Sequence, residues 1–232
     1  TLASLLIAVS LSLGGCRQAA PPPPAFDFGA FSDGFTQGAL ALSPVSATQA
    51  GYHTHNGVPL DEALDDYSAD GLRAQKTFYE GIRGRVAALN AASLDAEQQA
   101  DIEIINDAVG LALLELDGIQ AYRHNPTVYV ELAGNALYVP YVLNYAPVER
   151  RFGDIVKRLE KLPGLFEQAK ANLVDVPEVW NRVAREENDG NIALIDKTLR
   201  AGAPAGMKAA YDAAADKAIA AAKDFNAYLA GT

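Results

Sequence analysis

The sequence has 232 residues, of which half are hydrophobic, and a formal net charge of −10 at pH 7. The apolar content excludes an intrinsically disordered chain, and the negative charge argues against a nucleic-acid partner, because phosphate binding needs a positive surface. The single cysteine excludes an intrachain disulfide, so packing alone must stabilise the fold.

A lipoprotein signal peptide is predicted over residues 1–15. An apolar run from Leu2 to Leu13 is followed by Gly14, Gly15 and Cys16, and small residues after a short apolar segment are typical of a secretory cleavage site. With a cysteine as the first residue after the cut, this pattern predicts lipid attachment at Cys16. A transmembrane helix is an alternative, but it needs about 20 apolar residues. A buried core helix is the other alternative.

A proline-rich tether is predicted over residues 16–25, with the folded region over 26–232. Four successive prolines at 21–24 exclude a continuing helix and suit an extended spacer. The predicted partner is therefore a membrane, reached through Cys16, in the bacterial cell envelope. Arg17 directly after Cys16 favours the periplasmic side of the outer membrane. The chain opens with Thr1 rather than methionine, and we expect truncation at both ends.

The first part of the folded region is predicted to be helical. A short helix is expected from Phe31 to Leu42, ending before Pro44, and a turn or short helix from Ser46 to Tyr52. Two longer amphipathic helices are expected over 68–91 and 95–122. The apolar stripes of these two helices consist of Leu72, Tyr79, Ile82, Val86 and Leu89, and of Ile102, Ile105, Val109, Leu116 and Ile119.

Two capping signals support the two longer helices. Ser68 is a suitable N-cap, and Asp95 followed by Gln98 resembles a capping box. Because only a short polar turn separates these helices, we expect them to form an antiparallel helical hairpin.

The segment 125–147 is harder to assign from its sequence. It is rich in valine and tyrosine, as strands are, but Pro126, Pro140 and Pro147 interrupt it and no polar turn divides it. We expect short helices or an irregular aromatic segment packed against a bundle.

The remaining chain is also predicted to be helical. Phe152, Leu159, Phe166 and Leu173 are spaced seven apart, and Pro163 within this row predicts a kink or restart. Pro177 and Pro204 each suit the first turn of a further helix. The predicted fold class is all-α, a multi-helix bundle with antiparallel helical hairpins and one irregular aromatic segment.

A metal site is one hypothesis for two of the three histidines. His53 and His55 lie two apart, so both point to one face of an extended segment. Zinc needs three or four protein ligands, and an aspartate would have to complete the set: Asp61, Asp65 or Asp66. The alternative is a polar surface loop beside an acidic stretch. His124 has no such neighbour in the sequence.

Other polar and aromatic groups have structural alternatives. The acidic cluster of Asp61, Glu62, Asp65 and Asp66 suits a helix N-terminus better than acid–base catalysis. The basic residues are expected on the solvent-exposed face of one helix, with anion binding by the first as an alternative; they are Arg150, Arg151, Lys157, Arg158 and Lys161. Core packing is expected, rather than a pocket, for Tyr129, Tyr138, Tyr141 and Tyr145.

No complete active site is recognised in the sequence. It has no HExxH zinc motif, no GxSxG nucleophile elbow and no phosphate-binding glycine loop. Lipidation would consume the only cysteine. We therefore assign no catalytic, cofactor-binding or metal-binding residue to this chain, and Cys16 is the only residue given a chemical role.

Several sequence patches together resemble the N-terminal half of a bacterial family catalogued as domain of unknown function 885. They are ordered over residues 35–230 and comprise Leu42-Ser43-Pro44-Val45-Ser46-Ala47-Thr48, Gly51, His53 and Asp65-Asp66-Tyr67-Ser68, then Asn125-Pro126-Thr127-Val128-Tyr129, and then Arg151, Arg158-Leu159, Pro163, Ala169, Asn172-Leu173 and Pro177.

The resemblance implies a longer, exported lipoprotein. Members of that family resemble zinc metallopeptidases and carry an HExxH-type motif in their C-terminal half. This chain would then be the helical N-terminal part of a zinc-dependent peptidase with a peptide substrate. It would be inactive alone, with its metal site beyond Thr232. His53 matches the family's N-terminal pattern, not its zinc motif. The alternative is a non-enzymatic helical envelope lipoprotein that binds a ligand or a protein partner.

Overall fold

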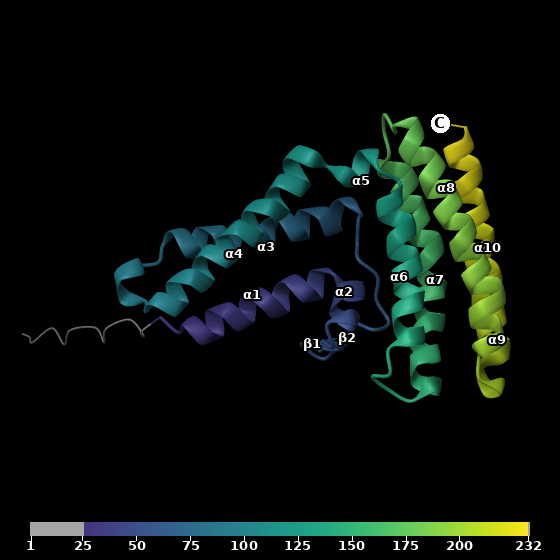
Figure 1. Ribbon diagram of the computed structural model, residues 1–232, viewed down its shortest axis with the longest axis horizontal. Coiled ribbons are helices and arrows are strands. Elements are labelled where there is room, and N and C mark those ends of the chain that lie inside the picture. The colour runs from purple at the N-terminus through teal and green to yellow at the C-terminus, as the bar shows by residue number, and fades with distance from the viewer. Residues whose placement is uncertain (1–25, 232) are drawn as a thin grey trace, which may run out of the picture.

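A computed structural model describes residues 26–231 of the chain. Two groups of helices are seen in Figure 1: an arm formed by α1, α3 and α4, and an upright bundle formed by α6, α7, α8 and α10. The predicted signal peptide at 1–15, the lipidation site Cys16 and the tether at 16–25 lie outside the described residues and stay predictions.

The all-α fold class is confirmed. The helices are α1 (Phe28–Leu42), α2 (Pro44–Gln49), α3 (Ala69–Ala87), α4 (Ala96–Leu114), α5 (Ala121–His124), α6 (Thr127–Val142), α7 (Val148–Asn172), α8 (Glu178–Ala193), α9 (Arg200–Gly202) and α10 (Lys208–Ala230). Two π-helical turns span Glu115–Ile119 and Leu194–Leu199, and two 3-10 turns span Ala91–Ser93 and Ala205–Met207. Within residues 26–231, no helix has both the length and the apolar character needed to cross a membrane.

Both predicted N-caps are present at the starts of the arm helices. The hydroxyl of Ser68 accepts a hydrogen bond of 3.1 Å from the backbone N–H of Gly71. Asp95 and Gln98 form the capping box, with each side chain accepting from the backbone N–H of the other. These local bonds satisfy N–H groups that a helix start leaves unpaired, which is why the two helix starts could be read from the sequence.

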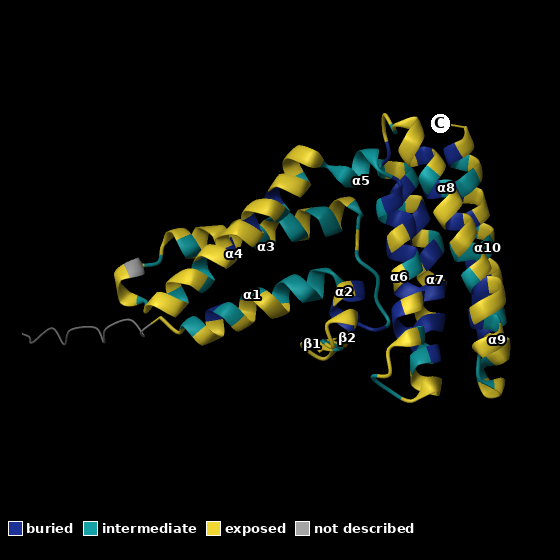
Figure 2. Ribbon diagram, in the orientation of Figure 1, coloured by how far each residue is buried: buried dark blue, intermediate teal, exposed yellow. Residues whose placement is uncertain are grey.

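The core has two parts. The larger core fills the bundle and includes Phe152, Leu159 and Phe166 of the predicted seven-residue row, all fully buried. The smaller core joins the arm helices through Phe31, Ile82, Ile105, Val109 and Leu113. Figure 2 shows the difference, with most buried positions in the bundle and mostly exposed or intermediate ones along the arm.

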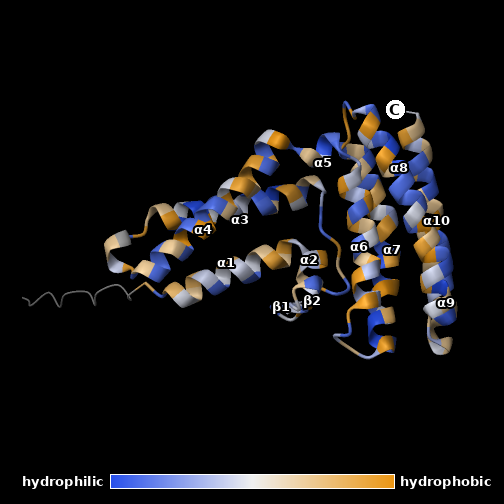
Figure 3. Ribbon diagram, viewed as in Figure 1, coloured by the Kyte–Doolittle hydropathy of each residue, from blue (hydrophilic) through white to orange (hydrophobic). Residues whose placement is uncertain are grey.

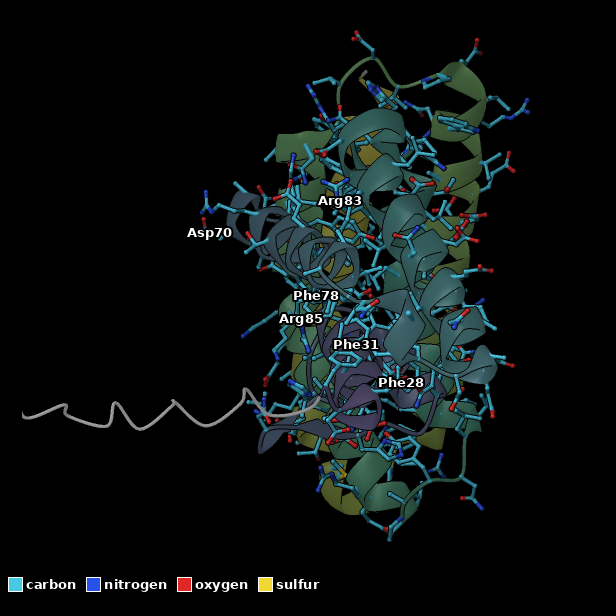
Figure 4. The ribbon with its side chains drawn as sticks, turned by 90° about the vertical axis from the view of Figure 1, so that its left-hand side faces the viewer. Phe28, Phe31, Asp70, Phe78, Arg83 and Arg85 are labelled. Atoms are coloured by element: carbon cyan, nitrogen blue, oxygen red, sulfur yellow. The ribbon has the colours of Figure 1, made fainter. Side chains whose placement is uncertain are left out.

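The arm is held together by contacts between α1, α3 and α4, as the predicted helical hairpin requires. Figure 4 looks at its free end, where Phe31 of α1 lies close to Arg85 of α3. The guanidinium carbon of Arg85 lies 4.6 Å from the centre of the Phe31 ring, a cation–π contact. The predicted stripe of α4 does not extend to Ile119, which is exposed and is the last residue of the π-helical turn.

Of the two expectations for 125–147, the helical one is confirmed for most of the segment, and residues 143–147 are irregular. Residues 127–142 form one continuous helix, α6, which packs against α2, α7 and α8. Its strand-like composition reflects burial, because apolar residues are needed wherever a helix has neighbours on several sides. Pro126 precedes the first turn and Pro140 lies in the last turn, where few backbone bonds are lost.

The restart predicted at Pro163 is not found. Helix α7 continues through Pro163 without interruption. An internal proline costs about 3 kcal/mol, and burial of Leu159, Leu162 and Phe166 on both sides of it offsets that cost.

A short β-hairpin was missed by the sequence analysis. Strands β1 (Thr54–His55) and β2 (Val58–Pro59) pair antiparallel around Asn56 and Gly57. Both turn residues have positive φ, 48° and 78°, as a type I′ turn requires, and Asn-Gly is the usual sequence for it. The hairpin places His53 and Asp61 on its two flanks.

Candidate functional site: a polar cluster around Arg158

Arg158 is the largest fully buried side chain among the described residues, with 0% exposure. Its predicted place on the solvent-exposed face of a helix is therefore wrong. The guanidinium donates to five acceptors at 2.7–3.3 Å, which are the carbonyls of Pro44, Leu60, Ala63 and Ala136 and the hydroxyl of Thr48.

Burial of this charge has an electrostatic consequence. Desolvation lowers the pKa of Arg158, and three nearby carboxylates oppose the shift, namely Asp61, Asp65 and Asp154. None of the three bonds Arg158 directly. Backbone carbonyls and one hydroxyl therefore solvate the charge directly, and the carboxylates balance it from beyond hydrogen-bond distance. The acceptors come from α2, the 60–63 loop and α6.

His53 is joined to this network through Asp61. The Nδ1 atom of His53 lies 2.9 Å from Oδ1 of Asp61, and the same oxygen accepts a bond of 2.8 Å from the hydroxyl of Thr48. The Asp61 side chain is almost fully buried, whereas 33% of the His53 side chain is exposed. The Nε2 atom of His53 makes no hydrogen bond to another described residue. A buried carboxylate thus orients the imidazole and leaves Nε2 free on the open side.

Tyr145 extends the cluster on the other side of His53. The two rings stack with centres 4.5 Å apart and planes inclined by 24°. The hydroxyl of Tyr145 donates to Oδ2 of Asp154 at 3.2 Å, and Nε of Arg150 donates to Oδ1 of Asp154 at 3.1 Å. Burial raises the pKa of Tyr145 and also that of Asp154, where Arg150 opposes the shift.

The accessible groups of the cluster lie at the corner where α6 turns into α7. Arg150 is mostly exposed, and His53 is partly so. Four large hydrophobic residues are exposed at the same corner: Tyr138, Val142, Leu143 and Val148. Figure 3 shows apolar residues at these ends of α6 and α7. Beside these apolar side chains, Nε2 of His53 can accept a hydrogen bond or a proton, and Arg150 can donate hydrogen bonds to a bound chain.

The structure does not bring the two histidines of the metal hypothesis together. Nδ1 of His55 lies 2.8 Å from the hydroxyl of Tyr52, whereas Nδ1 of His53 lies 2.9 Å from Asp61, so the two imidazoles have different partners. Asp65 accepts from the backbone N–H of Val45, and Asp66 accepts from that of Ser68. Over residues 26–231, no three side chains of His, Cys, Asp or Glu are grouped as metal ligands.

The other predicted residues have structural roles. Nδ1 of His124 lies 2.9 Å from the carbonyl of Val174. Arg151 was expected on the exposed face, but it caps the end of α6 by donating to the carbonyls of Pro140 and Tyr141, each at 2.8 Å. Lys157 is exposed as predicted and pairs with Glu160.

The four tyrosines that were expected in the core differ in how far they are buried. Tyr129 is fully buried, as predicted. Tyr138 is half-exposed, so its predicted place in the core is wrong. Tyr141 packs against the bundle core, with its ring edge-on to Phe152. Tyr145 stacks on His53 at the edge of the polar cluster.

One sequence signal could have located Arg158. Ile155, Arg158 and Leu162 are spaced three and four apart, which places all three on one face of a helix. Both flanking residues are buried. An arginine at an interior position of an apolar stripe indicates a buried charge with a polar network around it.

Comparisons with known proteins agree with this fold. The family model described as "Bacterial protein of unknown function (DUF885)" matches residues 44–232. A solved structure, described as "a putative lipoprotein of unknown function from Shewanella oneidensis", superposes with a TM-score of 0.79 at 20% sequence identity. The match covers 89% of this chain and 38% of that one, so this chain spans well under half of the solved relative. Among curated proteins no match was found. The chain belongs to the DUF885 family of bacterial proteins.

Proposed function

We propose that this chain is the helical N-terminal part of a lipid-anchored, zinc-dependent peptidase, and that it forms one wall of the substrate cleft. The observation that carries the proposal is the extent of the structural match. The match covers 89% of this chain but only 38% of a longer protein. A helical region that corresponds to one part of a larger chain is suited to form one wall of a cleft.

The metal of such a peptidase does not fit the described residues. A catalytic zinc needs about three protein ligands and an open position, and residues 26–231 offer no such group. The proposal therefore assigns the metal and the catalytic side chains to another part of the protein. No chemical step is assigned to the residues described here.

The corner around His53 is the face that we assign to the cleft. With Nδ1 of His53 donating to Asp61, its Nε2 atom can accept a hydrogen bond from a backbone N–H of an extended peptide, and the guanidinium of Arg150 can donate to a peptide carbonyl. The exposed side chains of Val142 and Leu143 can contact its apolar residues. Asp61 fixes the imidazole and Asp154 fixes the guanidinium, so little order has to be gained on binding.

The arm is the part that we assign to the membrane side. Its free end is formed by the N-terminal end of α1 together with the turn between α3 and α4 (Figure 1). Ten peptide units separate Cys16 from Phe26, so a lipid on Cys16 would hold this end within about 35 Å of the anchored residue. This arrangement supports a place in the bacterial cell envelope, for which we propose the periplasmic side of the outer membrane.

The test is zinc content and peptide hydrolysis of the protein encoded by the complete reading frame that contains this sequence. We expect about one zinc ion per chain, hydrolysis of quenched-fluorescent peptides, and loss of hydrolysis on chelation. The 232-residue chain alone should be inactive. A complete protein without zinc and without hydrolysis would contradict the proposal and favour the alternative, a non-enzymatic lipoprotein that binds a ligand or partner.

A further inference from the structure

A cavity of about 240 Å³ lies where the arm meets the bundle. Its walls come from the loop before α3, from α3 and α4, from the π-helical turn Glu115–Ile119, and from α5 and α6. Three tyrosines line it, together with one carboxylate: Tyr67, Tyr79, Tyr122 and Glu115. We call this cavity the junction pocket. It is separate from the polar cluster around Arg158, with which it shares no lining residue.

Two of the three tyrosines are fixed from behind by the bundle. The backbone of Tyr67 is held at both ends, because its N–H donates to Gln168 at 3.0 Å and its carbonyl accepts from Asn172 at 2.8 Å. Asn172 also donates to the hydroxyl of Tyr129, which in turn donates to the carbonyl of Tyr122 at 2.7 Å. The walls are therefore formed before any ligand arrives, which lowers the entropic cost of binding.

The polar groups inside the junction pocket are not used by the fold. The hydroxyls of Tyr67, Tyr79 and Tyr122 and the carboxylate of Glu115 make no hydrogen bond to another described residue. Gln75, which also lines the pocket, donates to the carbonyl of Asp66 and keeps its side-chain oxygen free as an acceptor. The pocket thus presents hydrogen-bonding groups without a partner in the fold, beside tyrosine rings of which two are held edge-on by neighbouring rings, Tyr67 by Tyr129 and Tyr79 by Phe78.

The electrostatic environment of the junction pocket is negative. Burial raises the pKa of Tyr67 to about 12, and the negative charges of Asp65 and Glu115 add to the shift. Lys76, on the neighbouring turn of α3, is paired with Asp117 and does not line the pocket. An anionic ligand would therefore be repelled, whereas a cation would be attracted.

We propose that the junction pocket binds a small organic cation, an alkylammonium group of the choline or amine type. Aromatic rings attract such a cation through their electron-rich faces, and Glu115 at the rim supplies the opposite charge. The rim is built on a π-helical turn followed by Gln120, whose φ is 51°. The pocket is large enough for a group of amino-acid size but not for a drug-sized molecule. This inference does not depend on the peptidase proposal.

The test compares choline with 3,3-dimethylbutan-1-ol, which has the same shape without the charge, by calorimetry on the full chain. We expect a dissociation constant for choline of about 1 mM or below and binding of the neutral alcohol at least about tenfold weaker. Equal binding of the two probes, or no binding of choline at about ten times that concentration, would overturn the proposal.

Conservative variants identify the residues responsible. Glu115→Gln should weaken choline binding by about fivefold, since it removes one charge at the rim. Tyr79→Phe should retain binding and Tyr79→Ala should abolish it, because the ring and not the hydroxyl attracts the cation. Glu103→Gln, the same change on an exposed part of α4, is the matched control and should bind like the wild type. If Glu115→Gln and Tyr79→Ala also bind choline like the wild type, the site is not the junction pocket.

Discussion

The guanidinium of Arg158 donates a hydrogen bond of 2.9 Å to the carbonyl of Ala136. In an uninterrupted helix this carbonyl would accept from the backbone N–H four residues later, but residue 140 is a proline and has no N–H. A side chain from α7 therefore supplies the bond that α6 cannot make for itself. Arg151 completes the same end of α6 by bonding the carbonyls of Pro140 and Tyr141. Two arginines of α7 thus make a proline-containing helix end compatible with burial.

Replacing Arg158 should destabilise the protein strongly. The substitution Arg158→Met removes five hydrogen bonds and the buried positive charge that acts on Asp61, Asp65 and Asp154. We expect a loss of about 3–5 kcal/mol in the free energy of unfolding, measured by urea denaturation. Lys157→Met, at the exposed neighbouring position, is the control and should change stability by less than about 0.5 kcal/mol. Equal effects of the two substitutions would contradict the role given to Arg158.

The link between Arg158 and Pro140 can be isolated by a double-mutant cycle. Pro140→Ala supplies a backbone N–H for the Ala136 carbonyl, so it should partly replace the bond that Arg158 makes. In the Arg158→Met background we expect Pro140→Ala to recover about 1 kcal/mol more than it does in the wild type. Strict additivity of the two changes would show that the arginine and the proline are energetically independent.

The contact between α6 and α8 should depend on Gly134. A Cβ atom at this position would lie 2.6 Å from Oδ1 of Asn191, whose amide donates to the carbonyl of Val130 at 2.7 Å. Gly134→Ala should therefore lower the free energy of unfolding by about 1–3 kcal/mol, measured by thermal or urea denaturation. Gly190→Ala lies in α8, where an added Cβ meets no atom within 4 Å. Gly190→Ala should leave the free energy of unfolding unchanged or raise it by up to about 1 kcal/mol. A similar decrease in unfolding free energy for both variants would rule out the proposed clash at Gly134.

Asp65 should make stability depend on pH. Burial raises its pKa from 3.8 to about 6 in the folded state, although the N–H of Val45 opposes the shift. Because the folded state binds this proton more tightly, the contribution of Asp65 to stability is complete below pH 3.8 and is lost as the pH rises through about 6.

Asp65→Asn removes this dependence and keeps an acceptor for Val45. Relative to the wild type, the variant should gain about 1–3 kcal/mol in unfolding free energy between pH 4 and pH 7.5. Asp33→Asn, on an exposed turn of α1, is the control and should show no such gain. A difference between wild type and Asp65→Asn that stays constant with pH would contradict the assignment.

Local signals in the sequence were sufficient for much of the fold. The caps at Ser68 and Asp95 act within three residues of themselves, and the row through Phe152, Leu159 and Phe166 follows from helix geometry. The Asn56-Gly57 turn is equally local and was overlooked. By contrast, the continuity of α6 could not be predicted, because the donor that compensates Pro140 comes from a separate helix.

The candidate sites depend on contacts that are distant in sequence. Arg158 bonds the carbonyl of Pro44 from 114 positions away and the hydroxyl of Thr48 from 110 positions away. Its burial therefore follows from the tertiary arrangement and not from its own helix. The junction pocket has the same origin, since Tyr67 and Tyr122 meet there only after the arm has packed on the bundle.

The claim that the face around His53 contacts the substrate can be tested in the complete protein. His53→Ala removes the oriented imidazole, whereas His55→Ala changes the same residue type on the same hairpin away from Asp61. Both variants should keep the zinc content of the wild type, because neither histidine belongs to a group of metal ligands within residues 26–231.

The most direct measurement is kcat/KM for peptide hydrolysis by these two variants at equal zinc content. We predict a loss of about tenfold or more for His53→Ala, corresponding to one lost hydrogen bond to a charged or oriented group, and no more than about a twofold change for His55→Ala. If His53→Ala hydrolyses peptides as efficiently as His55→Ala and the wild type, the polar cluster does not face the substrate and the central claim is wrong.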